Sequence, residues 1–190
     1  LNTVFPHDNF VAQDLAMIAR VIAARQTLGM NRQTFFIFAG GWDHHDEVID
    51  AQNYMLAEVS RGIGAFYDAM VELGVSDKVT LFTASDFART LTSNGRGSDH
   101  GWGGNHMVVG DAVLGRQIFG QYPDLFDGNA LDTGRGRLIP TTSVDLYFAE
   151  LARWLGVAES DLPTVLPNIE RFHQIGSGAP LGFMQPVTGV

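Results

Sequence analysis

The chain has 190 residues, of which 45% are hydrophobic, so it is long enough to bury one substantial core as a single domain or as part of a larger one. Its formal net charge of −9 and its pI near 4.9 argue against nucleic acid as a partner, because no basic stripe is available to neutralise phosphates. The absence of cysteine excludes disulfides, zinc–thiolate sites and cysteine nucleophiles.

The first quarter of the sequence predicts a helix followed by a strand. Apolar residues recur at helical spacing from residue 10 to residue 22, with Asp8 as the expected N-cap and Gly29 as the stop. Residues 34–39 then form a continuous apolar run that leads into glycine. Such a run is typical of a strand that is buried on both faces.

The next pattern predicts a crossover between parallel strands. Residues 47–73 have a helical apolar stripe, and residues 79–84 form a second strand-like run. Strand, long helix and strand together indicate a parallel crossover unit, in which ligands gather beyond the carboxyl ends of the strands. Residues 85–106, rich in Gly, Ser, Asn and Asp, are too long for an ordinary connection and are expected to be functional or disordered.

The rest of the chain predicts short strands and one more helix. Strands are expected at residues 107–109 and, at a sheet edge, 117–119. A helix is expected at residues 143–155, with Ser143 as its N-cap and Gly156 as its end. We therefore expect residues 1–176 to form a single α/β domain, or the C-terminal portion of a larger one. The Gly- and Pro-rich residues 177–190 are expected to be a loosely held tail.

Four of the six histidines fall into two clusters. His44 and His45 follow Asp43 just after the first expected strand, and His100 and His106 lie in the long polar segment. Imidazole and carboxylate together are typical ligands of divalent metals. An Asp-x-His in a loop is ordinarily turn chemistry beside a solvated ring, but two clusters at strand ends favour one metal site.

Other acids extend this prediction. Asp86 directly follows the second expected strand and should lie at the same rim. Asp99 and Asp46 are either partners that orient the imidazoles or ordinary loop acids. His106 fits the start of a strand better than a ligand position, because it is offset from His100.

Four motifs then carry a family resemblance. They read Gly-Gly-Trp-Asp-x-His, Phe-Thr-Ala-Ser-Asp-Phe-x-Arg-Thr, Ser-Asp-His-Gly-Trp-Gly and Gly-Arg-x-Ile-Pro-Thr-Thr-Ser-Val-Asp, at residues 40–45, 82–90, 98–103 and 136–145. In this order they resemble the bacterial family called domain of unknown function 1501, which by similarity belongs to the alkaline phosphatase and sulfatase superfamily. The resemblance implies the C-terminal part of an alkaline phosphatase-like α/β fold, with a mostly parallel sheet and helices on both faces.

The resemblance also implies a metal site. In the superfamily, an Asp and a His after one strand and a later His before another strand hold one divalent metal, and a further Asp helps to hold a second. The corresponding positions here are Asp43, His45, His100 and Asp86. One residue separates the first Asp and His, where the phosphatases have a longer gap, so His44 stays open as the ligand in place of His45. Phe87 stands where the phosphatases carry a His, which puts the second metal in question.

The activity that the resemblance implies is hydrolysis of a small phosphate or sulfate ester. Zinc is the expected metal, with manganese or iron as alternatives. Arg89 is a candidate contact for an anionic oxygen, and a surface salt bridge explains it equally well. The catalytic nucleophile is expected in a missing N-terminal half of the protein. A twin-arginine export signal upstream would place the protein in the periplasm or outside the cell, and no apolar run is long enough for a membrane span.

Two other functions stay open at this stage. The first is a non-catalytic exported protein that binds or assembles through a reduced metal site, which Phe87 favours. The second is a mononuclear iron enzyme with two His and one carboxylate as ligands. The long helix expected at residues 47–73 speaks against the second, because many such enzymes are built on β-barrels.

Overall fold

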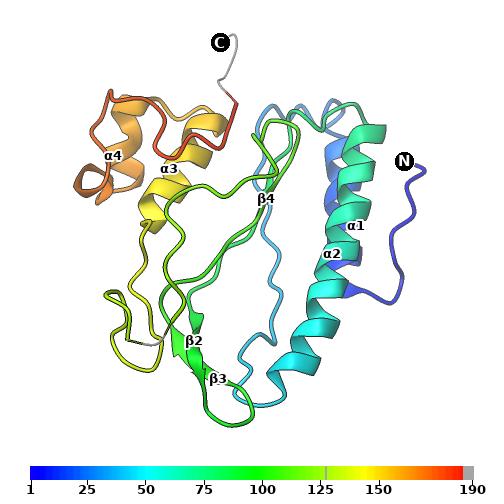
Figure 1. Cartoon of the computed structure of the whole chain (residues 1–190). Coiled ribbons are helices and arrows are strands. Elements are labelled where there is room, and N and C mark those ends of the chain that lie inside the picture. The colour runs from blue at the N-terminus through cyan, green and yellow to red at the C-terminus, as the bar shows by residue number, and fades with distance from the viewer. Residues whose placement is uncertain (127, 186–190) are drawn as a thin grey trace. The chain divides into compact units, whose positions relative to one another are not determined.

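The computed structural model describes residues 1–126 and 128–185 and divides into two compact units (Figure 1). The first unit consists of residues 1–81, 92–100 and 109–111. The second unit consists of residues 82–91 and 101–108 and the chain from residue 112 onward. The expectation of a single domain over residues 1–176 stays a prediction.

The first unit begins with helix α1 (Phe10–Ala23). Its N-cap is Asn9, one residue beyond the predicted Asp8, and the Asn9 side chain accepts a hydrogen bond from the backbone N–H of Ala12 at 3.0 Å. Asn9 is buried, and its amide also donates to the carbonyl of Glu58 at 2.6 Å. The same side chain therefore caps α1 and joins it to the next helix.

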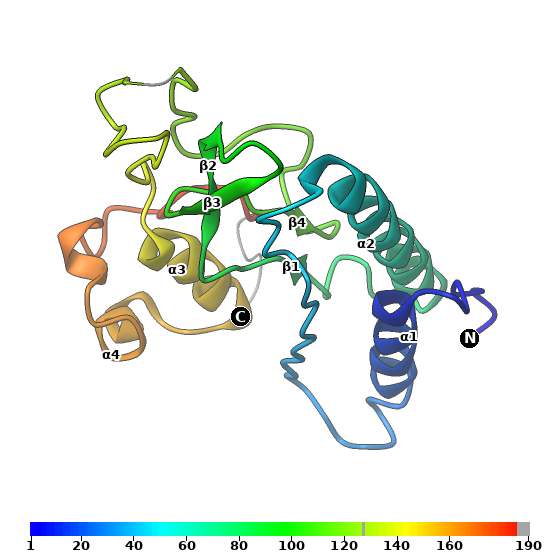
Figure 2. The same ribbon diagram turned by 90° about the horizontal axis from the view of Figure 1, so that it is seen from below.

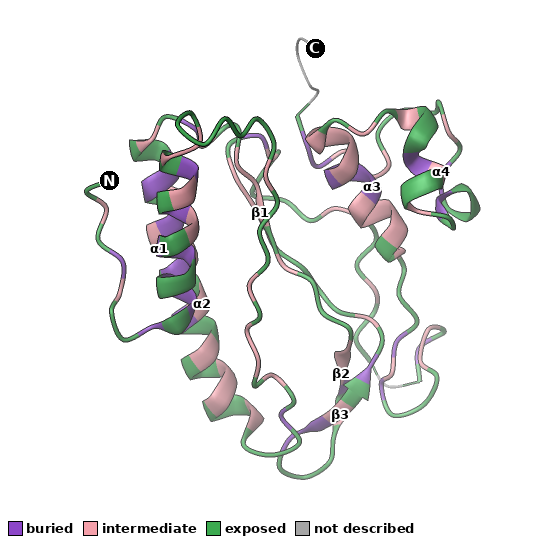
Figure 3. Ribbon diagram, turned by 180° about the vertical axis from the view of Figure 1, so that it is seen from behind, coloured by how far each residue is buried: buried purple, intermediate pink, exposed green. Residues whose placement is uncertain are grey.

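Helix α2 (Val48–Glu72) lies alongside α1, as both views show (Figures 1 and 2). Gly62 allows the close approach, because a Cβ there would lie 3.2 Å from the backbone nitrogen of Ala12. The buried face of α1 is continuous along its length (Figure 3). The core of the first unit consists of Phe5, Val11, Ala12, Leu15, Ala16, Ala19, Ile22, Phe66, Ala69, Met70 and Val75.

The predicted strand at residues 34–39 is not part of either sheet in the described structure, so this prediction is wrong. Ile37 and Ala39 do pack against the core of the first unit, but Phe36 and Phe38 are 87% and 78% exposed. The alternation is that of an extended segment with one partly buried face. Sequence could indicate extended backbone, but a strand also requires a neighbouring strand to pair with.

Two small antiparallel sheets complete the secondary structure of the middle of the chain. Strand β1 (Leu81–Phe82) pairs with β4 (Val108–Val109), and β2 (Ala88–Ser93) pairs with β3 (Ser98–Gly101). The predicted mixed α/β class is confirmed. The mostly parallel sheet of the alkaline phosphatase type stays a prediction.

The β2–β3 hairpin lies inside the segment that was expected to be one long loop. Its strands are made largely of polar residues and show no clear alternation of apolar side chains, which is the usual sequence signal of a strand. Between β2 and β3 the chain reverses direction in a tight turn, in which the backbone N–H of Asn94 donates to the carbonyl of Gly97 at 3.1 Å. The predicted edge strand at residues 117–119 does not form.

The second unit is built around helix α3 (Val144–Leu155). Ser143 caps it by accepting the N–H of Leu146 at 3.2 Å, and Gly156 ends it with φ +106°, a conformation that favours glycine. The segments η1 (Glu159–Asp161), α4 (Leu162–Val165) and η2 (Ile169–Arg171) follow. Ala149, Leu162 and Ile169 form one buried cluster, and Ala112, Leu151, Phe183 and Met184 form another.

The C-terminal segment was expected to be loosely held from residue 177 onward. In the second unit the buried carboxylate of Glu150 accepts hydrogen bonds from the backbone N–H groups of Leu181, Gly182 and Met184, at 3.1–3.2 Å. Residues 186–190 lie outside the described residues. Glu150 thus anchors the part of this segment that the structure describes.

Within the described ranges, none of the helices combines the length and the apolar character that crossing a bilayer requires.

Candidate metal site

Residues 42–46, the ligand segment, fold into two successive tight turns. The backbone N–H of His44 donates to the carbonyl of Trp42, and that of His45 donates to the carbonyl of Asp43, both at 3.0 Å. Such bonds between residues two apart define γ-turns. Asp43 and His45 are thereby drawn together, and their side chains approach to 3.0 Å between the carboxylate Oδ1 and the imidazole Nε2.

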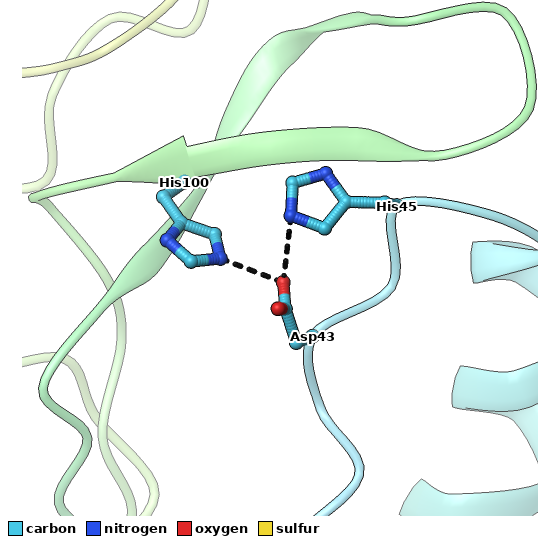
Figure 4. Close-up of side chains that lie close together, drawn as sticks. All are labelled: Asp43, His45 and His100. Carbon is cyan, nitrogen blue, oxygen red and sulfur yellow. Dashed lines mark hydrogen bonds and ion pairs between the residues drawn. The ribbon is translucent and has the colours of Figure 1, made fainter.

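His100 reaches the same carboxylate from strand β3. Its Nε2 lies 2.6 Å from Oδ1 of Asp43, so one oxygen atom contacts two imidazoles (Figure 4). The rings of His45 and His100 face each other at an angle of 36° with centroids 5.1 Å apart. The two histidines are 55 positions apart in the sequence, and the fold brings them to one carboxylate.

These three side chains form a group that could hold a metal ion. One ligand atom from each of Asp43, His45 and His100 lies within 4.8 Å of the other two. All three side chains are about half exposed, so solvent can reach the group. Two nitrogens and one oxygen are a ligand set that suits zinc and also manganese or iron.

A second carboxylate holds His45 from its other side. Oδ1 of Asp99 lies 3.2 Å from Nδ1 of His45. The side-chain amide of Asn94 donates both to Oδ1 of Asp99, at 3.3 Å, and to the backbone carbonyl of His45, at 3.0 Å. Both nitrogens of the His45 ring therefore face a carboxylate.

The tip of the hairpin, residues 92–100, is clamped onto the ligand segment. The backbone N–H of Ser98 donates to the carbonyl of His44 at 3.2 Å, and Nε of Arg96 lies 2.9 Å from a carboxylate oxygen of Asp46. Gly97 makes the closest approach, since a Cβ there would lie 2.4 Å from the carbonyl oxygen of His44 and 2.5 Å from the carbonyl carbon of His45. The contact requires glycine at this position.

The structure brings His45, and not His44, to the ligand group. The His44 side chain is turned away and buried, with its ring 6.2 Å from that of Trp42 in an edge-on contact. Within the described structure its Nε2 is buried and lacks a hydrogen-bond partner. The choice that the sequence left open is thus decided by the direction in which the two turns send each side chain.

Asp86, Arg89 and His106 belong to the second unit. The guanidinium carbon of Arg89 lies 5.8 Å from the centre of the Phe87 ring. His106 stacks on Tyr147, with ring centroids 5.7 Å apart, and partial desolvation lowers its pKa. Metal binding by Asp86 and an anion contact by Arg89 stay predictions.

Sequence reasoning missed two residues that support this site, Asn94 and Gly97. Their signal was present in the run Asn94-Gly95-Arg96-Gly97, which is typical of a tight turn between strands. The flanking segments are polar and lack the apolar alternation that predicts strands, so the sequence did not indicate that this turn joins the two strands of a hairpin. No pattern in the sequence showed that this turn would pack against the ligand segment.

Comparison with known proteins gives one match. A family model described as "Protein of unknown function (DUF1501)" matches residues 7–135, which include Asp43, His45 and His100. The last motif of the resemblance, at residues 136–145, lies beyond the matched range. No curated protein and no solved structure matches the chain. Because the match covers more than half of its length, the chain belongs to the DUF1501 family of proteins of unknown function.

Proposed function

We propose that Asp43, His45 and His100 bind a divalent metal ion in a hydrolase that acts on small phosphate or sulfate esters. The observation that carries the proposal is the contact of one Asp43 oxygen with two imidazole nitrogens, at 2.6 and 3.0 Å. Isolated surface ion pairs contribute little to stability, so a bound cation accounts for this convergence better than structural support does. The order of motifs along the chain supports the same site.

The ligand spacing fits a metal ion. Two ligand atoms held at about 2.0–2.1 Å by a tetrahedral zinc ion lie about 3.3 Å apart. The observed distances of 2.6 and 3.0 Å from Asp43 Oδ1 are shorter by about 0.7 and 0.3 Å, which rotations of these exposed side chains can supply. Three protein ligands leave a coordination position open, which is typical of a catalytic site rather than a structural one. Zinc is the proposed ion, and manganese or iron would suit the same atoms.

The residues of the chain then have separate roles. A bound divalent ion polarises an ester oxygen and lowers the pKa of bound water. Asp43 supplies the negative charge that balances the ion, and His45 and His100 supply neutral nitrogen ligands. Asp86 is proposed to help hold a second ion, and Arg89 to contact an anionic oxygen of the substrate through its planar fork. The nucleophile is assigned to a segment upstream of the matched motifs.

Fold and location belong to the same proposal. The motif order supports an alkaline phosphatase-like protein with a mostly parallel sheet, to which this chain contributes the C-terminal part. Export through a twin-arginine signal, to the periplasm or the exterior, is proposed on the same resemblance.

Phe87 supports a second candidate function. It follows Asp86 directly, at the position where the phosphatases carry a His, and its backbone carbonyl accepts the hydroxyl of Ser85 at 2.7 Å. An apolar side chain there cannot serve as a ligand. The alternative is an exported binding or assembly protein that keeps one metal site and does not catalyse hydrolysis.

Metal content tests the site, and turnover then separates the two functions. We expect one zinc or manganese ion per chain by elemental mass spectrometry after reconstitution, lost in Asp43→Ala and His100→Ala. His7→Ala is the matched control, because His7 is an exposed histidine of the same unit outside the ligand group. Equal metal content in all four proteins would contradict the site. Hydrolysis of nitrophenyl phosphate or sulfate by the longer protein, lost in Asp43→Ala, would support the hydrolase, and metal binding without turnover would support the alternative.

A further inference from the structure

We infer that Asp99 is a positioning residue that fixes the proton of His45 on Nδ1 and so makes Nε2 the metal-binding nitrogen. The inference rests on the proposed metal site and assigns a role to a residue that is not itself a ligand. Of the two acids considered as partners of the imidazoles, Asp46 instead accepts the N–H of Glu47 and pairs with Arg96. Asp99 alone of the two contacts a histidine ring, at 3.2 Å.

The chemistry of the two groups decides the direction of this hydrogen bond. An ionised carboxylate can only accept, so a neutral His45 donates either from Nδ1 to Asp99 or from Nε2 to Asp43, and a cation between Nε2 and Asp43 leaves the proton on Nδ1, facing Asp99. A neutral imidazole then has its lone pair on Nε2. That nitrogen lies 3.0 Å from the carboxylate of Asp43 and beside His100 (Figure 4). A lone pair that faces a carboxylate is favourable only with a cation between them, which is what a metal ligand requires.

Asn94 holds Asp99 in this position. Its amide nitrogen bonds Asp99 and the backbone of His45, and its amide oxygen accepts the N–H groups of Arg96 and Gly97 at 3.1 and 2.8 Å. The amide is therefore fixed by the turn on one side and by the site on the other. Carboxylates that orient metal-bound histidines in this way ordinarily change metal affinity by about 10–100-fold when they are removed.

The first test is the tautomer of His45 in the zinc-loaded wild-type protein. Proton–nitrogen correlation spectra of the imidazoles are recorded at about pH 8, above the ordinary histidine pKa of about 6.5. We expect the hydrogen of His45 on Nδ1. A proton on Nε2 of the zinc-loaded protein would overturn the inference, and this result needs no variant.

Variants of Asp99 then link the tautomer to metal binding. Asp99→Leu keeps the approximate shape but removes the acceptor, so the Nδ1–H tautomer should lose its dominance and zinc affinity, measured by competition with a chromophoric chelator, should fall about 10–100-fold. Asp99→Asn keeps an oxygen acceptor and should retain the tautomer with a smaller loss of affinity. Asp50→Asn removes a charge from the exposed start of α2 and is the control, with no expected change.

The outcomes separate the inference from the function on which it rests. Zinc affinity that is unchanged in His100→Ala would refute the proposed metal site, whatever the tautomer. Normal zinc binding in the wild type, with affinity and tautomer also unchanged in Asp99→Leu, would refute the positioning role alone. Thermal unfolding of each metal-free variant shows whether the hairpin tip has been lost, and a loss of affinity in Asp99→Leu with an unchanged tautomer would likewise assign Asp99 a merely structural role.

Discussion

Two regions of the first unit, the helix pair and the metal site, are held together by different interactions. The contact between α1 and α2 buries apolar side chains such as Leu15 and Met70, each 2% exposed. The contact between the hairpin tip and the ligand segment consists of backbone hydrogen bonds, an amide bridge and the close approach of a glycine without a side chain. Stability and metal affinity should therefore respond to different substitutions.

The largest effect on stability is expected from Leu15→Ala. Loss of a buried leucine side chain leaves a cavity and should lower the free energy of unfolding by about 2–5 kcal/mol, measured by urea denaturation. Zinc affinity of the folded variant should stay unchanged. Met17→Ala is the control, because Met17 is on the same helix and 57% exposed. A variant that lost stability and metal binding together would show that the two regions are coupled.

Gly97→Ala should instead lower zinc affinity and leave the helix pair intact. The added Cβ would lie within 2.4–2.7 Å of backbone atoms of residues 44–46, so the hairpin tip must move away from the ligand segment. We expect zinc affinity to fall about 10–100-fold, as for other residues that support a metal ligand. Hydrogen exchange should increase at residues 43–46 and 92–100 and stay unchanged in α1. Wild-type affinity would show that the clamp does not position the ligands.

Alanine substitutions at two glycines of α2 test how closely the two helices pack. Gly64→Ala should stabilise the protein by about 0.5–1 kcal/mol, because alanine favours the helix and the new Cβ would meet no atom within 4 Å beyond the neighbouring backbone of its own helix. At Gly62 the same gain is opposed by contacts of 3.2 Å with Ala12 and Val11 on α1. Gly62→Ala should therefore be less stable than Gly64→Ala in thermal unfolding. Equal effects would mean that the helices do not touch at Gly62.

The smallest effect is expected from Glu72 at the end of α2. Its carboxylate accepts hydrogen bonds from the hydroxyl of Thr3 and from the backbone N–H groups of Thr3 and Asn2, which lower the pKa of Glu72 from 4.5 to about 2. Since the folded-state pKa is lowered, the stabilisation is present above pH 4.5 and is lost as the pH falls toward 2.

Urea unfolding across this pH range measures that contribution. The wild type should exceed Glu72→Gln by a constant small margin above pH 5, and the margin should vanish near pH 2. Asp14→Asn, an exposed change on α1, is the control. A margin that does not change with pH would show that the charge of Glu72 has no part in holding residues 2 and 3.

Prediction from sequence succeeded where local periodicity decides the structure. Apolar spacing located both helices of the first unit, although α1 ends at Ala23 and not near Gly29. Serine and glycine at the ends of α3 also predicted its caps correctly. It failed at residues 34–39, because an apolar run does not reveal whether a partner strand is present, and at residues 88–101, because a polar hairpin lacks apolar alternation.

For the site, the sequence alone determined the chemistry of the ligands, since imidazole and carboxylate in two clusters predict a metal site wherever they meet. It also indicated the family, through the order of its motifs. Only the tertiary structure decided that His45 and not His44 joins Asp43 and His100. It also decided that Asp99 contacts Nδ1 of His45 and that Asn94 donates to the His45 carbonyl. The reason is that ligand identity is a property of single residues, whereas their convergence depends on two backbone turns and on the close contact at Gly97, which join residues about fifty positions apart.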